Sequence, residues 1–246
     1  MTFNFKKFSV QQDSATMKVN TDGVLVGAWF TVSSKEDQKI LDIGSGTGVI
    51  ALMAAQRLRE NNVSRFRVDA VEIDTPSSAE ALCNFISSPW AGHLKMFNAP
   101  LNFFADNCPE KYTGIVSNPP YFNNSLKNPS LSKRLARHTD SLSYQEIIVS
   151  SKKLLVPGGI LSVILPHEES ALFISIAEEK GFAVKRMCRV FAKEGDASPK
   201  RVMIGFALHP QKANAETSFQ DLCIMGPNLE FTPAYKALTG DFYLKF

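Results

Sequence analysis

The 246-residue chain contains little cysteine, and none of it occurs at paired spacing. Its four cysteines, Cys83, Cys108, Cys188 and Cys223, are scattered along the sequence. Scattered thiols argue against a zinc site and against a disulfide framework, and they are typical of proteins in a reducing compartment. We therefore expect a cytoplasmic protein that holds no metal.

Long apolar runs are also missing. Residues 1–7 have no apolar core behind them, and no stretch is apolar enough to suggest a transmembrane segment. This pattern predicts neither a signal peptide nor a membrane anchor. Internal repeats and low-complexity linkers are absent as well, so we expect a single domain over residues 1–246.

Neither sign of charge is in large excess. The chain has 27 Lys and Arg against 24 Asp and Glu, a net charge of +3, and its pI is about 8.6. With 44% hydrophobic and 21% charged residues it has the composition of an ordinary globular protein. The mild basicity is compatible with a nucleic-acid partner but does not identify one.

The sequence Asn118-Pro119-Pro120-Tyr121 follows residues 112–117, a β-rich run that predicts a buried strand. The two prolines end that strand, because neither can donate to a ladder. Asn118 and Tyr121 are therefore expected on a stiff loop at the carboxyl edge of a sheet. In open α/β folds, ligands bind at that edge.

Such a loop suits methyl transfer to a planar amino nitrogen, whose lone pair is delocalised. The carboxamide oxygen of Asn118 and the carbonyl of Pro119 can accept the two amino hydrogens and turn the lone pair toward an incoming methyl group. Tyr121 can stack on a flat substrate. The alternative interpretation is a tight turn with a packed aromatic residue.

A glycine-rich turn lies earlier in the chain. Residues 39–43 predict a buried strand, Gly44-Ser45-Gly46-Thr47-Gly48 the turn, and residues 49–58 an apolar helix. A nicotinamide-cofactor motif requires glycine or alanine where Val49 stands. Asp42 would repel a pyrophosphate but would attract a cationic amino acid group. We therefore predict S-adenosylmethionine as the cofactor, bound by Asp42, Gly44, Gly46 and Gly48.

Two more acidic positions are candidate cofactor contacts. Glu72 lies where the strand predicted over residues 67–74 ends, and it can accept both ribose hydroxyls; the alternative is a solvated strand end. Thr21 or Asp22 can cap a short helix. We expect Thr21 and Asp22 to contact the ligand at that helix start.

Residues 122–138 form a polar, turn-rich stretch beside the expected site. Its Lys133, Arg134, Arg137 and His138 are candidate substrate contacts, because a long loop in this place is more often functional than structural. Individually, basic side chains are best interpreted as solvated surface. Collectively, those of this loop favour RNA together with Lys185, Arg186, Arg189, Lys200 and Arg201.

The last part of the chain changes its pattern. Residues 182–191 and 202–208 predict two strands without a long helix between them, hence an antiparallel pair at the end of a mostly parallel sheet. Residues 218–224 suggest a further short strand, and residues 233–242 a terminal helix or turn.

With these pieces placed, the chain resembles class I S-adenosylmethionine-dependent methyltransferases. It is more closely similar to the tRNA1(Val) (adenine-37-N6)-methyltransferase family. The matching stretches are residues 17–25, 41–48, 70–74, Asn118-Pro119-Pro120-Tyr121, Arg137-His138, residues 200–202 and the tail from Ala234 to Leu244. The resemblance therefore covers nearly the whole chain.

The resemblance implies an α/β, Rossmann-like sheet of seven strands, six parallel and one antiparallel, with helices on both faces. It implies an N-terminal extension, residues 1–32, over the cofactor site, and a C-terminal part, residues 182–246, with the antiparallel strands and the tail. It also implies a target adenine beside a tRNA anticodon, gripped by Asn118, Pro119 and Tyr121. We expect a monomer that acts on tRNA.

One region departs from the class I pattern. Many of these enzymes place an acid after the third strand to contact the cofactor's adenine amine, but here the sequence is Asn98-Ala99-Pro100. We expect Asn98 to make that contact, with Asn102 or a backbone carbonyl as substitutes.

Three other functions fit parts of the sequence. The loop that begins at Asn118 could grip a protein glutamine amide or an adenine of DNA, although no separate DNA-recognition domain is visible. A non-catalytic nucleotide-binding or RNA-binding protein could retain the fold. The intact Asp42, Glu72 and Asn118 argue against that last interpretation.

Overall fold

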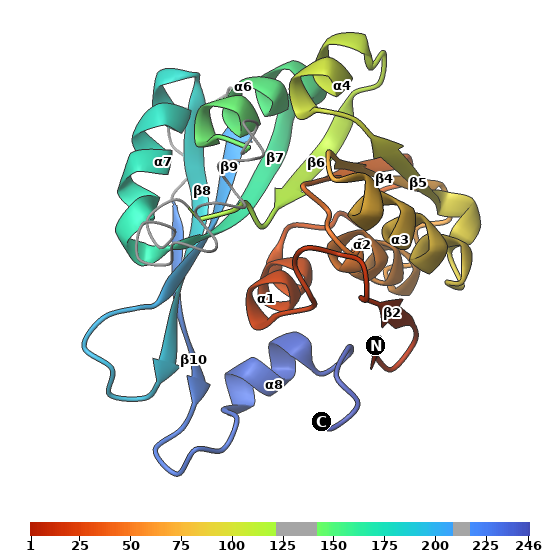
Figure 1. Ribbon diagram of the computed structural model, residues 1–246. Helices are drawn as coiled ribbons and strands as arrows, with labels where there is room; N and C mark the ends of the chain where they lie inside the picture. The colour runs from red at the N-terminus through yellow and green to blue at the C-terminus, as the bar shows by residue number, and fades with distance from the viewer. Residues whose placement is uncertain (122–141, 209–216) are drawn as a thin grey trace, which may run out of the picture.

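The computed structural model describes residues 1–121, 142–208 and 217–246 (Figure 1). The predicted substrate contacts Lys133, Arg134, Arg137 and His138 lie outside the described residues. Within these ranges, no helix has the length and apolarity needed to cross a bilayer.

Strands and helices alternate through most of the chain. The strands are β1 (Thr2–Asn4), β2 (Ser9–Gln11), β3 (Gln38–Ile43), β4 (Phe66–Glu72), β5 (Leu94–Asn98), β6 (Tyr112–Ser117), β7 (Leu155–Pro166), β8 (Phe182–Lys193), β9 (Arg201–Leu208) and β10 (Ser218–Met225). The helices are α1 (Thr21–Trp29), α2 (Val49–Glu60), α3 (Thr75–Ile86), the 3-10 turn η1 (Ala91–His93), α4 (Leu101–Asn107), α6 (Tyr144–Leu154), α7 (His167–Glu179) and α8 (Pro233–Thr239).

In the described part of the chain, the central sheet has eight strands in the order β10-β8-β9-β7-β6-β3-β4-β5. β9 pairs antiparallel with both β7 and β8, and the other pairs are parallel. The Rossmann-like α/β fold and the antiparallel β8–β9 pair are therefore confirmed. The implied count of seven strands is one short, because β10 adds a parallel strand beside β8 at the sheet edge.

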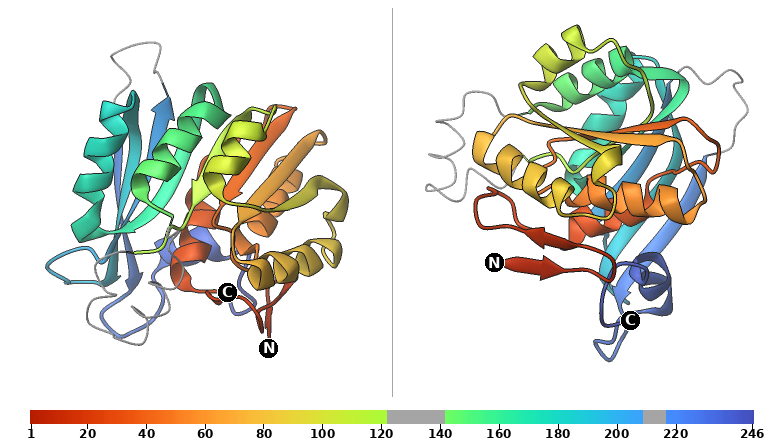
Figure 2. Two further views of the ribbon diagram at one scale, coloured as in Figure 1. Left: turned by 45° about the horizontal axis from the view of Figure 1, so that its top comes forward. Right: turned by 90° about the vertical axis from the view of Figure 1, so that its right-hand side faces the viewer.

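Helices cover both faces of the sheet (Figure 2). α1, α2 and α3 contribute to one apolar core, and α4, α6 and α7 contribute to the other. Successive side chains of a strand point to opposite faces, so Ile40 of β3 packs in the first core and Leu41 packs in the second. Most of the strands are thus buried on both sides, as expected for a parallel sheet.

The cap of α1 lies one residue before the first of the two positions that we expected, Thr21 and Asp22. The helix is capped by Asn20, whose side-chain oxygen accepts the N–H of Gly23 at 2.9 Å, and neither Thr21 nor Asp22 caps it. This assignment leaves the Asp22 carboxylate free to bond elsewhere. α1 lies against β6 and β7 and packs on α2 (Figure 1).

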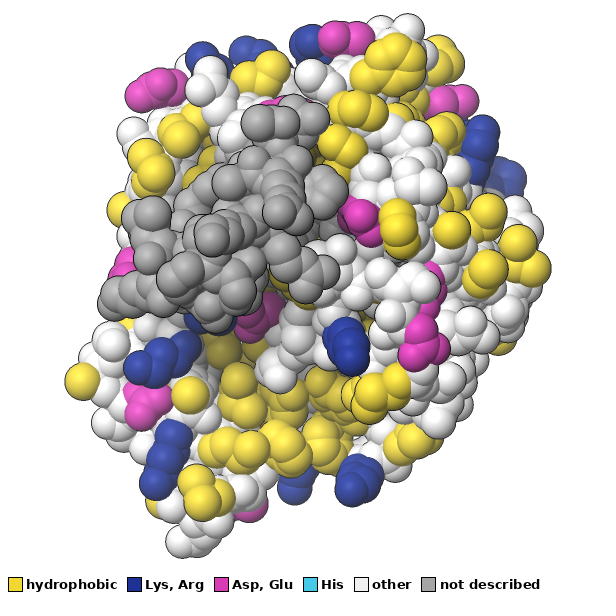
Figure 3. All heavy atoms as spheres, in the orientation of Figure 1, with side chains coloured by type: hydrophobic (Ala, Val, Ile, Leu, Met, Phe, Trp, Pro, Cys, Tyr) yellow, Lys and Arg dark blue, Asp and Glu magenta, His cyan; other side chains and the backbone are white. Residues whose placement is uncertain are grey.

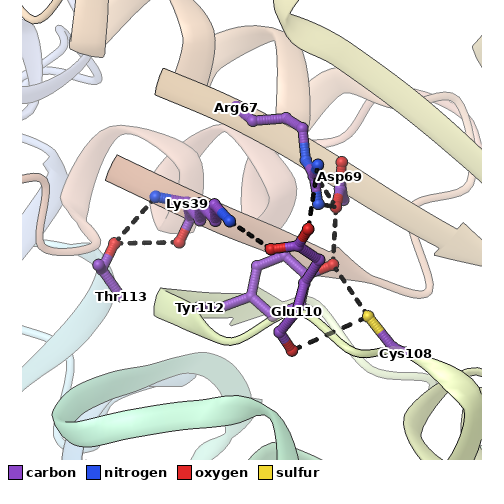
Figure 4. Close-up of polar contacts among 7 residues, drawn as sticks. All are labelled: Lys39, Arg67, Asp69, Cys108, Glu110, Tyr112 and Thr113. Atoms are coloured by element: carbon purple, nitrogen blue, oxygen red, sulfur yellow. Dashed lines mark hydrogen bonds and ion pairs between the residues drawn. The ribbon is translucent and has the colours of Figure 1, made fainter. Parts of the chain in front are cut away.

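A polar cluster lies at the amino ends of the strands, on the α4 face of the sheet (Figure 4). The fully buried Asp69 accepts hydrogen bonds from the Tyr112 hydroxyl at 2.7 Å and from Arg67 at 2.8 Å. Glu110 pairs with Lys39 and lies 3.8 Å from the Arg67 guanidinium. These contacts join β3, β4 and β6 at the edge opposite the candidate site.

The two ends of the chain form a clasp, which we define as the β1–β2 hairpin packed on the segment after α8. The N–H of Lys6 donates to the Phe242 carbonyl at 2.8 Å, and the Lys6 ammonium donates to the Gly240 carbonyl at 2.6 Å. Phe5 stacks on Tyr243 with ring centroids 6.1 Å apart. Apolar side chains gather over this region of the surface (Figure 3).

Candidate active site

The carboxyl ends of β3, β4 and β6 meet at one edge of the sheet. The chain runs from β3 through β4 to β5 on one side and then returns to place β6 on the other side of β3. A reversal of this kind leaves a crevice beyond the strand ends, which is where open α/β folds bind ligands. The hydroxyl of Ser117 donates to the Ile43 carbonyl at 2.8 Å and fixes the ends of β6 and β3 together.

The turn after β3 needs its glycines. Gly44, Gly46 and Gly48 have φ values of 67°, 52° and 78°, the left-handed region that other residues rarely adopt. A methyl group on Gly48 would also come within 2.5 Å of the Phe85 ring. The chain therefore turns sharply here and presents main-chain atoms rather than side chains at the start of α2.

A small hollow lies beside this turn. Its lining comes from three parts of the chain: the segment before α1 together with Gly23 in the first turn of that helix, the glycine turn with the start of α2, and Asn118. Met17 and Lys18 form part of the wall. They belong to the N-terminal extension expected over the cofactor site, but neither was among the predicted site residues. The only sequence signal was their position directly before a helix start, in a stretch that resembled the family.

The segment before α1 is fastened to α3. Glu80 accepts the N–H groups of Asp13, Ser14 and Ala15 at 2.6, 3.0 and 2.8 Å. Asn84 accepts the N–H of Gln11 at 2.8 Å. These bonds hold residues 11–15 in place and thereby set the position of the wall that follows them.

Asp42 is placed differently from our expectation of direct cofactor contact. Its side chain is fully buried and accepts the N–H of Ala51, in the first turn of α2, at 3.1 Å. Burial raises the pKa of Asp42 to about 8. Because alternate residues of β3 face the α2 layer, the carboxyl group lies behind the glycine turn and contacts the first turn of α2.

Glu72 ends β4 and faces the glycine turn. One carboxylate oxygen accepts the N–H of Gly46 and the other accepts the N–H of Asp74, each at 2.9 Å. Asp74 in turn caps α3 by accepting the N–H of Ser77 at 2.9 Å. Glu72 thus links the turn after β3 to the turn after β4, the two loops between which a ribose would lie.

Asn98 also supports the loop after β4. Its amide nitrogen donates to the carbonyls of Glu72 and Ile73 at 2.9 and 3.2 Å, and its oxygen accepts the Thr75 hydroxyl at 2.9 Å. The side chain is therefore engaged in fixing main chain around Glu72. Its expected contact with the cofactor's adenine remains a prediction.

Asn118 and Tyr121 lie where β6 ends, and Pro119 between them is buried. The Tyr121 hydroxyl is 2.9 Å from the Asn118 side-chain oxygen and 2.9 Å from Asp22. Thr21 is exposed at the helix start. Asp22 therefore contacts the loop that carries Asn118, rather than the glycine turn.

Three of the basic residues that we grouped as favouring RNA have partners within the protein. Arg186 lies over the Trp29 ring at 3.9 Å, and Arg189 makes two bonds to Asp221 at 2.7 and 2.6 Å. The Arg201 guanidinium donates to Asp22 at 2.8 Å. The charges of these three residues are neutralised or covered by partners within the protein. They therefore add less support for RNA binding than a count of basic residues suggests.

Two solved structures that share this fold are described as methyltransferases. A predicted O-methyltransferase from Agrobacterium tumefaciens superposes with a TM-score of 0.68 at 16% identity, covering 90% of this chain and 96% of that chain. A putative class I S-adenosylmethionine-dependent methyltransferase from Listeria monocytogenes gives 0.59 at 15% identity, with 86% and 67% covered. At these identities the likeness concerns the fold.

The sequence itself matches more specifically. The family model described as methyltransferase small domain matches residues 28–171. The tRNA1(Val) (adenine(37)-N6)-methyltransferase of Parabacteroides distasonis is 40% identical over 243 residues, 99% of this chain and 98% of the relative. The protein of that name from Flavobacterium psychrophilum is 40% identical over 244 residues, 99% of both chains. The chain is a methyltransferase that belongs to the tRNA1(Val) (adenine(37)-N6)-methyltransferase family.

Proposed function

We propose that this enzyme methylates N6 of adenine 37, next to the anticodon of tRNA1(Val). One observation carries the proposal: Asn118 and the glycine turn line the same hollow, so a group gripped by Asn118 lies beside the cofactor loop. The names of the relatives, 36 to 40% identical over nearly the full length, give the substrate.

The cofactor of this family is S-adenosylmethionine, as the spacing of residues 44–48 predicts, and the described residues fit it. The left-handed glycines leave the main chain open to close approach. Glu72 lies between the turns after β3 and β4 and keeps lone pairs that can accept ribose hydroxyls. When bound, S-adenosylmethionine supplies an electrophilic methyl group.

The residues at the end of β6 then orient the amine. The carboxamide oxygen of Asn118 and the Pro119 carbonyl accept the two hydrogens of N6, which directs the nitrogen lone pair toward the methyl group. As the bond from N6 to the methyl carbon forms, the bond between that carbon and the cofactor's sulfur would break, leaving a neutral thioether. The nitrogen would then carry the positive charge and lose a proton to solvent. No strong base is needed, so catalysis consists mainly of positioning and electrostatics.

The Tyr121 ring has less free surface for stacking on a base than we expected from the sequence. The Arg201 guanidinium lies 5.0 Å from its ring centroid, so only the opposite ring face can carry a base. The base must leave its stack to reach this loop. An anticodon-loop adenine is already partly unstacked, which keeps the energy of extrusion modest.

We also propose that residues 1–246 work as one domain and that one copy is sufficient. Residues 1–32 contribute Met17 and Lys18 to the wall of the hollow. The tail packs on the N-terminal hairpin through Lys6. Light scattering of the purified enzyme, alone and with tRNA, would give the stoichiometry, and a dimer that is required for activity would contradict this part.

The test is methylation of bulk tRNA from a strain that lacks the gene, followed by nucleoside mapping. We expect N6-methyladenosine at position 37 of tRNA1(Val) only. A transcript with guanosine at position 37 is the matched substrate control and should accept no methyl group. Methylation of that control, or of a protein glutamine or DNA adenine instead of tRNA, would overturn the proposal. Cofactor binding without any transfer would favour a non-catalytic protein.

A further inference from the structure

Three side chains from distant parts of the chain form a polar relay beside Asn118. Tyr121 follows the prolines after β6, Asp22 lies in the first turn of α1, and Arg201 is the first residue of β9. The Tyr121 hydroxyl and the Arg201 guanidinium meet the same oxygen of Asp22, at 2.9 and 2.8 Å. We call these three residues the Asp22 relay.

Sheet topology explains how Arg201 reaches this place. β9 runs antiparallel to β7, and Arg201 is paired in register with Pro166, the last residue of β7. The antiparallel strand therefore begins at the edge where the parallel strands end. If β9 ran parallel to β7 instead, its first residue, Arg201, would lie at the opposite edge of the sheet, away from Asn118.

The Tyr121 hydroxyl has two oxygen neighbours but only one proton. It lies 2.9 Å from Asp22 and 2.9 Å from the side-chain oxygen of Asn118. A carboxylate is a stronger acceptor than a carboxamide, because bonds to ionised groups are about twice as strong as neutral ones. Burial, and then the charge of Asp22, raise the pKa of Tyr121, so the hydroxyl keeps its proton.

This assignment of the proton determines which end of the Asn118 carboxamide faces Tyr121. Once the hydroxyl donates to Asp22, its oxygen can only accept, so the NH2 group of Asn118 is the favourable neighbour. A carboxamide exchanges its two ends by a half-turn with little change in shape. With the side-chain oxygen of Asn118 facing Tyr121, the side-chain nitrogen lies on the Gly23 side, 3.9 Å from where a methyl group on Gly23 would be. The half-turn exchanges the two atoms and brings the oxygen to the Gly23 side. Gly23 lines the hollow, so the oxygen then faces it.

We propose that Asp22 and Arg201 are positioning residues for methyl transfer. They make the Tyr121 hydroxyl donate its proton to Asp22, and the acceptor oxygen of Asn118 therefore turns toward the substrate amine. This inference rests on the proposed function. Arg201 contributes by holding the Asp22 carboxylate in place through its hydrogen bond and by covering one face of the Tyr121 ring.

A merely structural role for the Asp22 relay makes different predictions. If the ion pair only fastened β9 to α1, removing it would lower stability, and its effect on rate would be independent of Tyr121. If it positions Asn118, its effect on rate must pass through the hydroxyl. A double-mutant cycle separates the two cases.

The experiment measures single-turnover methylation of tRNA, with S-adenosylmethionine and tRNA affinities and unfolding temperature recorded for each variant. We expect Asp22→Asn and Arg201→Ala to slow the single turnover about tenfold to a hundredfold, with both dissociation constants nearly unchanged. Asp22→Asn should add little to Tyr121→Phe, because the proton is already absent. Arg201→Lys should recover part of the rate.

The matched control is Arg65→Ala, which removes a two-bond ion pair with Asp37 near the start of β4 and away from Asn118. It should leave the rate at the parent value. Fully additive effects of Asp22→Asn and Tyr121→Phe, or a parent rate for Arg201→Ala, would overturn the inference.

A second readout keeps the inference separate from the proposed function. The side-chain amide signals of Asn118, assigned by their loss in Asn118→Ala, can be followed by NMR in the free enzyme. Asp22→Asn and Arg201→Ala should shift these signals, whereas Arg65→Ala should not. If the parent enzyme methylates no tRNA, the proposed function fails, and the amide signals still decide whether the Asp22 relay fixes the orientation of the Asn118 side chain. Unshifted signals in Asp22→Asn and Arg201→Ala would overturn the inference.

Discussion

Glu72 and Gly46 are joined by a hydrogen bond of 2.9 Å that crosses between the ends of two neighbouring strands. The bond fixes the middle of the glycine turn to a carboxylate whose second oxygen is held by Asp74. The group that we expect to bind the ribose therefore also shapes the turn that would receive the rest of the cofactor.

Replacing Glu72 by alanine should weaken S-adenosylmethionine binding about tenfold to a hundredfold, because hydrogen bonds to a charged acceptor contribute roughly 1.5–3 kcal/mol. Calorimetry with the cofactor measures this. The matched control is Glu36→Ala, which removes a carboxylate that accepts main-chain N–H groups of Ser64 and Arg65 near the start of β4. An affinity equal to the parent's would move the ribose contact elsewhere, with Asp74 the next candidate.

Asn118→Ala should lower the single-turnover rate about a hundredfold or more, since one positioned hydrogen bond to the reacting group is lost. Affinities for tRNA and cofactor should change little, because they depend on other contacts. Asn118→Asp keeps an acceptor and should retain some activity. Asn107→Ala, at the exposed end of α4, serves as control. A near-parent rate for Asn118→Ala would make the loop a structural turn.

Gly48→Ala should destabilise the protein by clearly more than Gly158→Ala. The two glycines have nearly equal φ values, 78° and 77°, so the strain of a left-handed alanine, about 1–2 kcal/mol, is common to both. Only at Gly48 would the new methyl group meet a neighbour, the Phe85 ring at 2.5 Å, whereas Gly158 faces open space. Urea unfolding of both variants gives the comparison, and equal losses would show that the helix start adjusts freely.

Asp42→Asn should change how stability depends on pH. In the folded protein Asp42 keeps its proton up to about pH 8, whereas the unfolded chain loses it near 3.8. Between these values the unfolded state binds fewer protons, so this group's contribution to stability falls as pH rises, by at most about 1.4 kcal/mol per unit. The variant lacks that slope and should gain relative to the parent between pH 5 and 8. Parallel unfolding curves would contradict the buried, protonated state.

Reversing the charge of Lys133, Arg134 and Arg137 should weaken tRNA binding and reduce its salt dependence, while cofactor affinity stays the same. Contacts to phosphates release counterions, so each lost contact lowers the salt slope by roughly 0.7–0.9. Reversal of the exposed Lys35, Arg59 and Lys152 is the control with equal net charge. Filter binding at several salt concentrations measures both, and equal losses in the two triple variants would mean that only net charge matters.

Local patterns predicted most of the fold. The buried runs at residues 39–43 and 112–117 became β3 and β6, since apolar periodicity reports burial directly. The run at 218–224 became β10. The sequence did not predict α4, a helix of seven residues that begins at Leu101 and has no side-chain hydrogen bond from its N-cap residue, Pro100. A segment this short depends on tertiary packing, which Leu101 and Phe104 supply.

The candidate site was less predictable than the fold, because its contacts join distant parts of the chain. The glycine turn and Asn118 have local signatures, and both line the hollow. The partner of Arg201 lies 179 residues away, at Asp22, and no local motif reports that pairing. Asp42 shows the opposite case: its motif position suggested ligand contact, while the alternation along β3 turns its side chain into the interior. Its contact with the cofactor stays a prediction.

The clasp between the two ends of the chain has a consequence for the order of folding. Lys6 contacts Gly240 across 234 residues, so this contact closes a very long loop at a high cost in chain entropy and should form late in folding. Contacts absent from the transition state act on unfolding rather than on folding. Truncating the Lys6 side chain should therefore shorten the lifetime of the folded state without slowing its formation. Because α8 packs on α1, we expect loss of the clasp also to loosen α1 and, with it, Asp22.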